Sequence, residues 1–416
     1  MDDIVCIRCS LLCDDGLAEI TKDGASSIGL CRLGHTHLDT MAHLKTTEAI
    51  SREGGKEKKL SLEEALNKAA DLLLSSEHPL LYGWSQCTNE TIKEGISLAK
   101  TIKGVFDSNA STGLLQSLKH SIHNMKLETD LEEVMNQGEF ILYWGSNPVE
   151  SSHRHASRFT VFPRGEKVIQ GVESRIIGVI DVRETETMKM SNHRIVIQTG
   201  KDKELVEALI SDLKGNAPVK TSVAGLPVST LIGLSQALRK SDYTVIFYGS
   251  GILNSGHMIE NLSAIEEMIQ TLRDMGKKAF ALPMWHESND MGIIDAMHKA
   301  KIDAIEGEST LLKISRGDFD VALVVCSDPL ASLPNDAARG LVKTKMIYIG
   351  PEGGLTENKS QLSLRVADEI ISGKGTMTRV DMKEIPLKVW RDKQPSNTAF
   401  EVITQLHQLI QEKING

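Results

Sequence analysis

Four of the six cysteines in this chain lie near its start, with a spacing that suits the ligands of a metal centre. Cys6, Cys9 and Cys13 follow the pattern C-x2-C-x3-C, and Cys31 comes after seventeen further residues. Three thiolates in so short a stretch can converge from one tight loop, and a short hairpin can return the fourth to the same point. Four cysteine thiolates are the ligand set of a [4Fe-4S] cluster. The spacing therefore predicts a metal centre near the N-terminus, with an iron-sulfur cluster as the favoured occupant.

Zinc is the main alternative occupant, since tetrahedral sites of four thiolates are common for this ion. Such sites usually come from two separated C-x2-C pairs, whereas this stretch has one pair and a C-x3-C step. The difference favours a cluster and leaves zinc open. Disulfides, or buried cysteines without any ligand, are the least favoured interpretation.

The first residues also bear on where the protein resides. Met1, Asp2 and Asp3 make the start acidic, and no apolar run of the length of a secretory signal or a membrane span follows. We therefore expect a cytoplasmic protein that does not enter a membrane. Cysteines stay reduced in that compartment, which again favours a metal centre over disulfides.

The composition indicates a folded chain of two or three domains. The chain has 416 residues, of which 40% are hydrophobic and 25% charged, and this length exceeds one ordinary core. Its net charge of -9, without a concentration of Lys and Arg, argues against nucleic acid as a partner. One Lys-rich run, residues 52–59, is short and contains glycine, so we expect a solvated linker there.

Beyond this run, the pattern alternates between amphipathic helices and buried strands. Residues 61–74 begin with Ser61 and Glu64 in a capping box, and residues 89–100 and 399–413 also repeat apolar side chains at helical spacing. Continuous apolar runs lie between such helices, which is typical of parallel strands buried on both faces. The predicted strands cover residues 79–84, 139–145, 175–181, 243–249, 278–283, 321–326 and 345–350. The fold class is therefore α/β, with doubly wound parallel sheets.

Small and polar residues follow these predicted strands, at the edge where open α/β sheets bind ligands. The loops concerned are 145–148, 181–185, 249–251, 327–329 and 350–354. Each loop alone is weak evidence, because turns after strands need such residues anyway. Their repetition along one edge favours a large, nucleotide-like ligand that lies across two α/β units.

Taken together, these features resemble the molybdopterin-dependent oxidoreductases, and most closely the B subunit of formylmethanofuran dehydrogenase. The resemblance covers almost the whole chain and rests on a combination of motifs. They are residues 6–15 with 31–34, then 143–148, 153–158, 162–165, 179–187, 327–329 and 373–379. The resemblance implies an N-terminal iron-sulfur domain (1–50), an α/β domain formed by 51–136 together with 316–416, and a second, Rossmann-like α/β domain (137–315).

The resemblance also implies cofactors and partners. Cys6, Cys9, Cys13 and Cys31 would hold a [4Fe-4S] cluster that carries electrons. A molybdopterin guanine dinucleotide with molybdenum or tungsten would lie beside it. Its binding residues would be Gly145, Ser146, Asn147, Asp181, Arg183, Thr185, Gly249, Ser327 and Asp328. Together with other subunits, such a protein interconverts carbon dioxide or formate and formyl-methanofuran in one-carbon metabolism.

The chain departs from the family where catalysis takes place. In catalytic members the segment that here reads 107–116 carries a metal-binding Cys followed by His, and this chain has Gly113 and Leu114 instead. Neither side chain can ligate a metal or move a proton. Trp285, with His286 beside it, stands where the family has an Arg that positions the anionic substrate, and an indole cannot supply the bidentate contacts of Arg.

These losses suit a second interpretation, a subunit without redox chemistry. The resemblance extends to the B subunit of a formyltransferase/hydrolase complex of methylotrophic bacteria, which serves as a scaffold while another subunit releases formate. The remaining candidates are weaker. His153 and His155 can share a strand face as a metal pair, but no third ligand accompanies them, and a structural role is favoured. Cys87 and Cys326 follow predicted strands and are expected to be inert.

Overall fold

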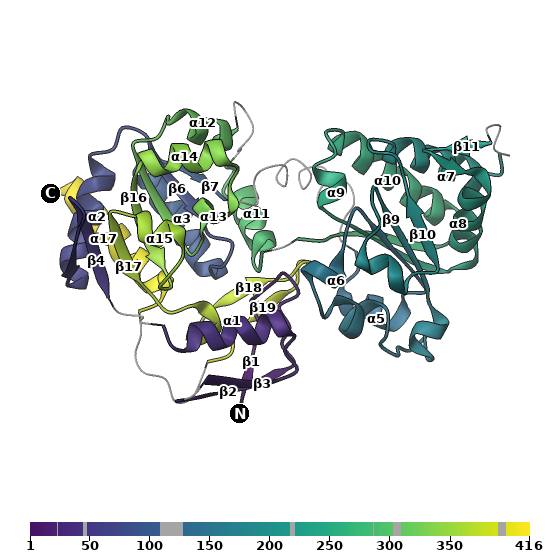
Figure 1. Cartoon of the computed structure of the whole chain (residues 1–416), viewed down its shortest axis with the longest axis horizontal. Helices are drawn as coiled ribbons and strands as arrows, with labels where there is room; N and C mark the ends of the chain where they lie inside the picture. Colours follow the sequence, from purple (N-terminus) through teal and green to yellow (C-terminus); the bar gives the residue numbers. More distant parts are fainter. Residues whose placement is uncertain are drawn as a thin grey trace. The chain divides into compact units, whose positions relative to one another are not determined.

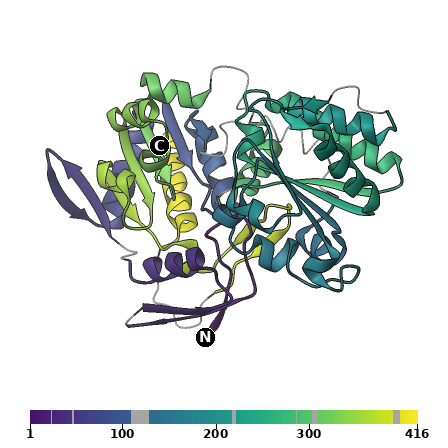
Figure 2. The same ribbon diagram turned by 45° about the vertical axis from the view of Figure 1, so that its right-hand side comes forward.

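The computed structural model describes residues 1–22, 24–44, 48–108, 128–216, 221–285, 287–302, 309–389 and 397–416. The chain forms two compact units (Figures 1 and 2). Unit 1 consists of residues 1–112, 287–379 and 384–416, and unit 2 of residues 113–286 and 380–383. The domain boundaries expected from the sequence lie after residues 50, 136 and 315. The cysteine-rich start lies in unit 1 with the first α/β sheet.

Unit 1 begins with a small antiparallel sheet of three strands, β1 (Asp2–Ile4), β2 (Gly16–Thr21) and β3 (Gly24–Ile28), followed by helix α1 (Arg32–Ala42). Apolar side chains of this segment, such as Ile4 and Leu38, share one core with Ile370 and Ile385 from near the C-terminus. The latter come from α16 (Glu369–Ser372) and from the hairpin of β18 (Thr376–Thr378) and β19 (Glu384–Pro386). This shared core ties the first residues to unit 1.

The main sheet of unit 1 has seven strands in the order β5-β4-β17-β16-β15-β6-β7. The parallel ones are β6 (Pro79–Gly83), β7 (Val105–Asp107), β15 (Val321–Val325), β16 (Lys345–Gly350) and β17 (Leu362–Arg365). From β6 the chain passes outward to β7, and β15 later starts on the other side of β6. Strand order therefore reverses between β6 and β15, which is the point where sheets of this kind bind ligands.

Helices cover both faces of this sheet (Figure 1). On one face, α12 (Thr310–Arg316) and α14 (Asn335–Lys343) contribute Ile314 and Leu341 to a core with Tyr82 and Val324. Helix α17 (Ala399–Asn415) packs against α2 (Leu62–Leu74) and α3 (Asn89–Thr101). The short helices α13 (Pro329–Ser332) and α15 (Leu355–Lys359) follow β15 and β16, and α11 (Asp290–Lys299) packs against α3. The predicted helices at 61–74, 89–100 and 399–413 are confirmed.

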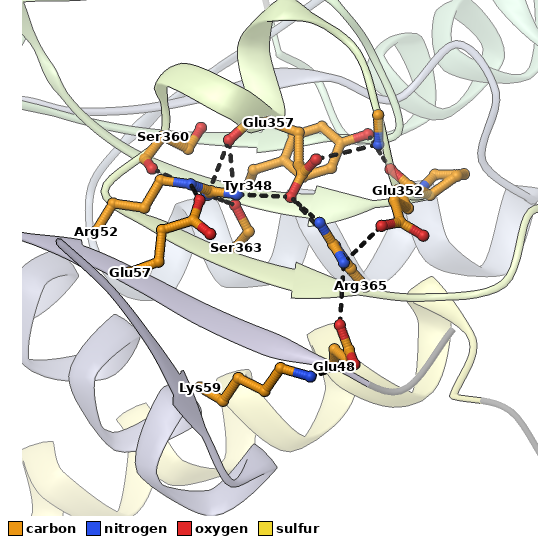
Figure 3. Close-up of polar contacts among 12 residues, drawn as sticks. Glu48, Arg52, Glu57, Lys59, Tyr348, Glu352, Glu357, Ser360, Ser363 and Arg365 are labelled. Carbon is orange, nitrogen blue, oxygen red and sulfur yellow. Dashed lines mark hydrogen bonds and ion pairs between the residues drawn. The ribbon is translucent and has the colours of Figure 1, made fainter. Parts of the chain in front are cut away.

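The prediction that the Lys-rich run is a solvated linker is wrong. This segment forms a hairpin of β4 (Ala49–Glu53) and β5 (Lys56–Leu60), and β4 pairs antiparallel with β17. Figure 3 shows the polar contacts that fix it. The guanidinium of Arg52 donates to the Ser363 hydroxyl at 2.7 Å and to the Glu357 carboxylate at 3.1 Å. Arg365 donates to the same carboxylate at 3.2 Å. Because Glu357 is almost fully buried, these two cations compensate a charge that would otherwise be costly inside the protein.

The charge of this run also has a place in the fold. Strand β5 is an edge strand of the sheet, and its residues are mostly exposed. Charged side chains, lysines above all, keep such an edge from pairing with another chain. Because of the same lysines, β5 contains no apolar run, so the hydrophobic pattern does not predict this strand.

Unit 2 is built on one parallel sheet in the order β10-β9-β8-β13-β14. Its strands are β8 (Phe140–Trp144), β9 (Ile176–Asp181), β10 (His193–Val196), β13 (Tyr243–Tyr248) and β14 (Lys278–Pro283). The chain goes outward from β8 to β9 and β10, then returns to the other side of β8 with β13 and β14. Strand order reverses between β8 and β13, so this point is the expected ligand edge of unit 2.

The helices of unit 2 complete its core. The longer ones are α5 (Leu131–Gln137), α7 (Asp202–Leu213), α8 (Val228–Lys240) and α10 (Met258–Asp274). Short α6 (Pro148–Ser151), the π-helix η1 (His155–Thr160) and the 3-10 turns η2 (Gly171–Ser174) and η3 (Glu186–Met190) follow β8 and β9. Short α9 (Ser250–Leu253) follows β13, and β11 (Ser222–Val223) pairs with β12 (Leu226–Pro227).

All seven strands predicted from apolar runs are confirmed, to within one or two residues at their ends. The α/β class and the parallel sheets are confirmed as well. In the ranges that the structure describes, no helix is both long enough and apolar enough to cross a membrane.

Candidate functional site

The cysteines at the start come from a closed loop and from the first turn of α1. In the loop, the Cys6 N–H donates to the carbonyl oxygen of Cys13 at 2.8 Å, and the Leu12 N–H donates to that of Cys9 at 3.2 Å. Leu12 has φ 41°, in the left-handed region, and this reverses the chain between the second and third cysteine. Cys31 lies beyond the hairpin of β2 and β3, where it is the N-cap residue of α1. The predicted loop and returning hairpin are therefore present.

The sulfur atoms of these cysteines lie in one neighbourhood. A Cβ placed on Gly34 would lie 2.6 Å from the Cys6 sulfur and 3.9 Å from the Cys31 sulfur, so both sulfurs lie over the same turn of α1. Burial raises the pKa of the Cys9 thiol to about 12, and nearby Cys13 and Cys31 add to the effect. Burial and the other three cysteines raise the pKa of the Cys6 thiol in the same direction.

Chemically, these residue types fit an iron-sulfur cluster, because four free cysteines come from one loop and the adjoining start of α1, and two of them are strongly desolvated. Their raised pKa values mean that thiols, and not thiolates, are the stable form when no cation is near. Metal binding would then release protons. Among the residues that the structure describes, no group of three or more His, Cys, Asp or Glu side chains is arranged closely enough to hold a metal ion.

In unit 2 the loops after β8 and β13 meet at the point where strand order reverses. Gly145 has φ 56°, and a Cβ on it would lie 2.8 Å from the backbone nitrogen of Ile252. A Cβ on Gly249 would lie 2.6 Å from the carbonyl oxygen of Gly145. The Gly251 N–H donates to that same oxygen at 2.9 Å. These predicted ligand glycines thus have a packing role, since only glycine lets the two loops approach so closely.

Next to these glycines, the same edge holds buried polar atoms that have no hydrogen-bond partner among the residues that the structure describes. They are the Ser146 hydroxyl, the Asn147 amide nitrogen and the Thr185 hydroxyl. Ser146 and Asn147 follow β8, and Thr185 follows the neighbouring strand β9. Buried polar atoms are rarely left unpaired, so each of these is a candidate contact to a bound ligand or water. They are three of the residues predicted from the resemblance.

The other two predicted residues, at the end of β9 and just beyond it, are arranged differently. The Asp181 carboxylate accepts from the backbone N–H of Arg183 at 3.2 Å and so closes the turn at the end of the strand. The Arg183 side chain is 63% exposed and lies 4.0 Å from the Glu150 carboxylate. A cation this exposed is available to an anionic ligand, since its present ion pair is long and solvated.

In unit 1 the predicted residues Ser327 and Asp328 follow β15, at the point where that sheet reverses its strand order. The Asp328 carboxylate accepts three hydrogen bonds from the start of α15: from the Thr356 hydroxyl at 2.6 Å, and from the Thr356 and Leu355 N–H groups at 2.9 Å each. Its role visible in the structure is to anchor α15. Whether it also contacts a cofactor stays a prediction.

The positions that would decide catalysis lie mostly outside the described residues. This applies to Gly113, Leu114 and His286. Trp285 follows β14 and is buried. An indole that is packed inside unit 2 offers no charge to a substrate.

The prediction that His153 and His155 share a strand face is wrong. His155 begins the π-helix η1, and its ring is fully buried, with Nδ1 3.1 Å from both the Tyr143 and Thr160 hydroxyls. Burial lowers its pKa to about 3, so the imidazole is neutral. The ring also packs edge-on against Phe247. This histidine therefore belongs to the core of unit 2.

The motif 373–379 has a structural role. The resemblance includes this motif but assigns it no function. The Thr376 N–H donates to the Glu90 carboxylate at 3.0 Å. The Thr378 N–H donates to the side-chain oxygen of Asn289 at 2.8 Å. Glu90 lies at the start of α3 and Asn289 just before α11, so the motif joins three distant parts of unit 1.

A buried acid near this motif is not evident from the sequence. The Asn289 N–H donates to the carbonyl oxygen of Ser85 at 2.8 Å, which places the start of α11 at the carboxyl end of β6. Asp290 follows, and its carboxylate accepts from the Glu287 N–H at 3.3 Å. Burial, helped by the charge of Glu287, raises the pKa of Asp290 to about 7. Nothing in the local sequence marks this aspartate as buried.

Comparison with proteins of known identity finds two distant relatives of this chain in sequence. The B subunit of the tungsten-containing formylmethanofuran dehydrogenase 2 of Methanocaldococcus jannaschii is 29% identical over 407 residues, which cover 92% of each chain. The corresponding subunit of Methanococcus maripaludis is 28% identical over 409 residues, with the same coverage. No established family profile matches the chain.

Solved structures share its fold. A chain of the formyltransferase/hydrolase complex of Methylorubrum extorquens, in complex with methylofuran, aligns with a TM-score of 0.66 and 18% identity, covering 88% of this chain and 100% of that one. Acetylene hydratase from Pelobacter acetylenicus aligns with the same TM-score at 11% identity, covering 100% of this chain and 70% of that one. Since the sequence relation runs through nearly the whole length of both proteins, the chain is a distant homologue of the B subunit of formylmethanofuran dehydrogenase.

Proposed function

We propose that this chain is the B-type subunit of a formylmethanofuran dehydrogenase-type complex in one-carbon metabolism. The observation that carries the proposal is the relation to two B subunits of the tungsten enzyme over 92% of each chain. A relation of this extent runs through both α/β units and their ligand edges. As a subunit, the chain would act together with partner subunits that handle the formyl group.

The N-terminal cysteines support the first cofactor of this proposal. Cys6, Cys9, Cys13 and Cys31 would hold a [4Fe-4S] cluster, which supplies one-electron transfer when bound. The protein's own contribution is to bury Cys6 and Cys13 and to shield Cys9 in part, and this desolvation raises the pKa of Cys6 and Cys9. Burial and hydrogen bonding to the sulfurs are the means by which a protein sets the potential of such a cluster.

The unpaired polar atoms in unit 2 support a dinucleotide cofactor. The hydroxyls of Ser146 and Thr185 and the amide nitrogen of Asn147 can all donate to acceptor oxygens, and Arg183 adds a positive charge nearby in the sequence. A pterin guanine dinucleotide presents many such acceptors on its diphosphate. With molybdenum or tungsten bound, that cofactor supplies two-electron transfer.

One specific observation favours a second candidate, a scaffold subunit that lacks redox chemistry. Gly113 and Leu114 stand where the resemblance places the metal-binding Cys and its neighbouring His. A chain without a metal ligand can keep the fold, and even the cysteine cluster, after the catalytic metal is lost. In this role the subunit would serve a complex that releases formate from formyl-methanofuran by hydrolysis on another subunit.

Elemental analysis of the purified complex separates the two functions. Molybdenum or tungsten in stoichiometric amount, with guanine nucleotide released by acid hydrolysis, is the result expected of a dehydrogenase and would exclude the scaffold. Iron alone is the result expected of the scaffold and would exclude the dehydrogenase. A purified complex that contains no bound cofactor and does not act on the formyl group would contradict both functions.

The cysteine assignment has its own test. We expect Cys9→Ser to lose most of the bound iron and the broad visible absorption of the cluster, because one of four ligands is removed. Cys87→Ser is the matched control, since this cysteine lies outside the N-terminal group and should leave both signals unchanged. If iron content and absorption survive in Cys9→Ser, the assignment is wrong.

A further inference from the structure

Two buried cysteines outside the N-terminal group lie on neighbouring turns at the ligand edge of unit 1. Strands β6 and β15 are parallel neighbours, and Gly83 at the end of β6 pairs with Val325 at the end of β15. Cys326 follows β15 directly, and Cys87 lies in the turn between β6 and α3. Both are free cysteines, and the Cys87 N–H donates to the Trp84 carbonyl at 2.9 Å, while the Trp84 N–H donates to the Val325 carbonyl at 3.0 Å. These bonds bring the two turns together, and burial, with Cys326 nearby, raises the pKa of the Cys87 thiol.

The backbone around this pair is held in an unusual conformation. Trp84 has φ 75° and Cys326 has φ 45°, and residues with a Cβ seldom adopt such angles. Hydrogen bonds keep them there: the Trp84 N–H donates to the Val325 carbonyl at 3.0 Å, and the Cys326 N–H donates to the Ile349 carbonyl at 2.8 Å. Such strain persists only where the surrounding structure fixes it. The two turns that carry the sulfurs are therefore firmly positioned.

We propose that Cys87 and Cys326 form a reversible disulfide when the protein meets a small-molecule disulfide. Cys326 is 5% exposed and Cys87 not at all, so Cys326 is the sulfur that such an oxidant reaches first. Its thiolate attacks the small disulfide, and one small thiol leaves. The Cys87 thiolate then attacks the Cys326 sulfur of this mixed disulfide and displaces the second small thiol. The pair loses two electrons and two protons, which the small disulfide takes up as it becomes two thiols.

A bond at this place would affect the loop that follows β15. It would link the turn between β6 and α3 to the residues directly before Ser327 and Asp328. Asp328 in turn anchors α15 through its hydrogen bonds with Leu355 and Thr356. Oxidation would thus fix the ligand edge of unit 1 in one arrangement. This inference is independent of the proposed function, because it needs only the fold of unit 1.

Peptide mapping of the full-length folded protein tests the proposal. The protein is incubated with oxidised glutathione, its remaining thiols are blocked, and it is digested with trypsin without reduction. Trypsin releases Cys87 in the peptide 69–93 and Cys326 in the peptide 317–339, and each of these contains a single cysteine. We expect a cross-linked species of these two peptides, with both thiols lost in equal amount, and its disappearance on addition of dithiothreitol.

Two variants make the result decisive. In Cys326→Ser, which closely matches the size of cysteine, we expect Cys87 to remain a free thiol under the same treatment. Cys9→Ser is the matched control in the N-terminal group and should leave the 69–93 to 317–339 cross-link unchanged. Both thiols persisting in the folded wild-type protein, or Cys87 pairing with an N-terminal cysteine instead, would overturn the proposal.

Discussion

The loops that follow β8 in unit 2 and β15 in unit 1 are built alike. Each consists of a left-handed residue, a serine, an Asn or Asp and a proline that opens a short helix: Gly145-Ser146-Asn147-Pro148 and Cys326-Ser327-Asp328-Pro329. The backbone angles of Asn147 (φ -126°, ψ 71°) and Asp328 (φ -117°, ψ 70°) nearly coincide. Two loops this similar, at the edges of two similar sheets, indicate one structural plan used twice.

The likeness extends to hydrogen bonds with a threonine beyond the next strand. Asn147 Oδ1 accepts from the Thr187 N–H at 3.3 Å and hydroxyl at 2.5 Å. Asp328 Oδ1 accepts from the Thr356 N–H at 2.9 Å and hydroxyl at 2.6 Å. The difference lies in the second side-chain atom. Asp328 Oδ2 accepts from the Leu355 N–H at 2.9 Å, whereas the buried Asn147 nitrogen has no partner in the described part of the chain.

The second side-chain atom of the Asn or Asp therefore determines which ligand edge keeps an unused hydrogen-bonding group. The Asp328 carboxylate is occupied by α15, but the Asn147 amide keeps a donor for something outside the chain. The contrast continues in the titratable groups that each unit buries. Unit 2 buries the neutral imidazole of His155, whose Nε2 is unpaired with respect to the described residues, and unit 1 buries the acid Asp290. The two units should therefore respond to pH in opposite directions.

The largest expected effect is the loss of stability of unit 2 in acid. The pKa of His155 is lowered from 6.5 to about 3, so its stabilising contribution is complete above pH 6.5 and is lost as pH falls toward 3. The loss amounts to about 5 kcal/mol, at 1.36 kcal/mol per unit. Hydrogen exchange of peptides from β8 and η1 between pH 7 and pH 4, corrected for the intrinsic rate, measures about 3 kcal/mol of this loss, because the remainder develops only below pH 4. His155→Gln cannot titrate, and an equal acid response in this variant would contradict the prediction.

Unit 1 should show the opposite trend through Asp290. Its pKa is raised from 3.8 to about 7, so the stabilising contribution is complete below pH 3.8 and is lost as pH rises through 7. This corresponds to about 4 kcal/mol. We expect Asp290→Asn to stabilise unit 1 at pH 8 and to leave its stability nearly unchanged at pH 4. Denaturant unfolding at both values, monitored by exchange of α11 peptides, checks this. Equal gains in stability at pH 8 and pH 4 would show that the Asp290 carboxyl does not titrate between these pH values.

How much of this contrast the sequence predicts depends on the range of the interaction. Apolar runs locate β8 and β15, and the polar residues after them mark the ligand edges, because both signals are local. The partners of Asn147 and Asp328 are not predictable in this way, since Thr187 and Thr356 come from beyond the next strand. The hairpin of β4 and β5 was missed because its charged residues are explained only by a buried partner, Glu357, in a distant segment.

Exchanging each Asx residue for alanine tests the two loops directly and gives the smallest of the three effects. Asp328→Ala should cost about 3 kcal/mol, because the N–H groups of Leu355 and Thr356 and the Thr356 hydroxyl lose a charged acceptor. Asn147→Ala should cost about 1 kcal/mol or less, since the lost bonds to Thr187 are offset by removal of an unpaired buried donor. Urea unfolding of the two variants, followed by exchange of α15 and η3 peptides, measures both.

The variants Asn147→Ala and Asp328→Ala also distinguish a ligand edge without a bound cofactor from one that holds a cofactor. If a dinucleotide cofactor accepts a hydrogen bond from the Asn147 nitrogen, Asn147→Ala becomes costlier in the cofactor-bearing complex than in the isolated chain, while the cost of Asp328→Ala changes less. A cost for Asn147→Ala that already equals that of Asp328→Ala in the isolated chain would contradict the contrast between the loops. It would mean that the amide has found a partner without a cofactor, so that the loops differ in sequence but not in hydrogen bonding.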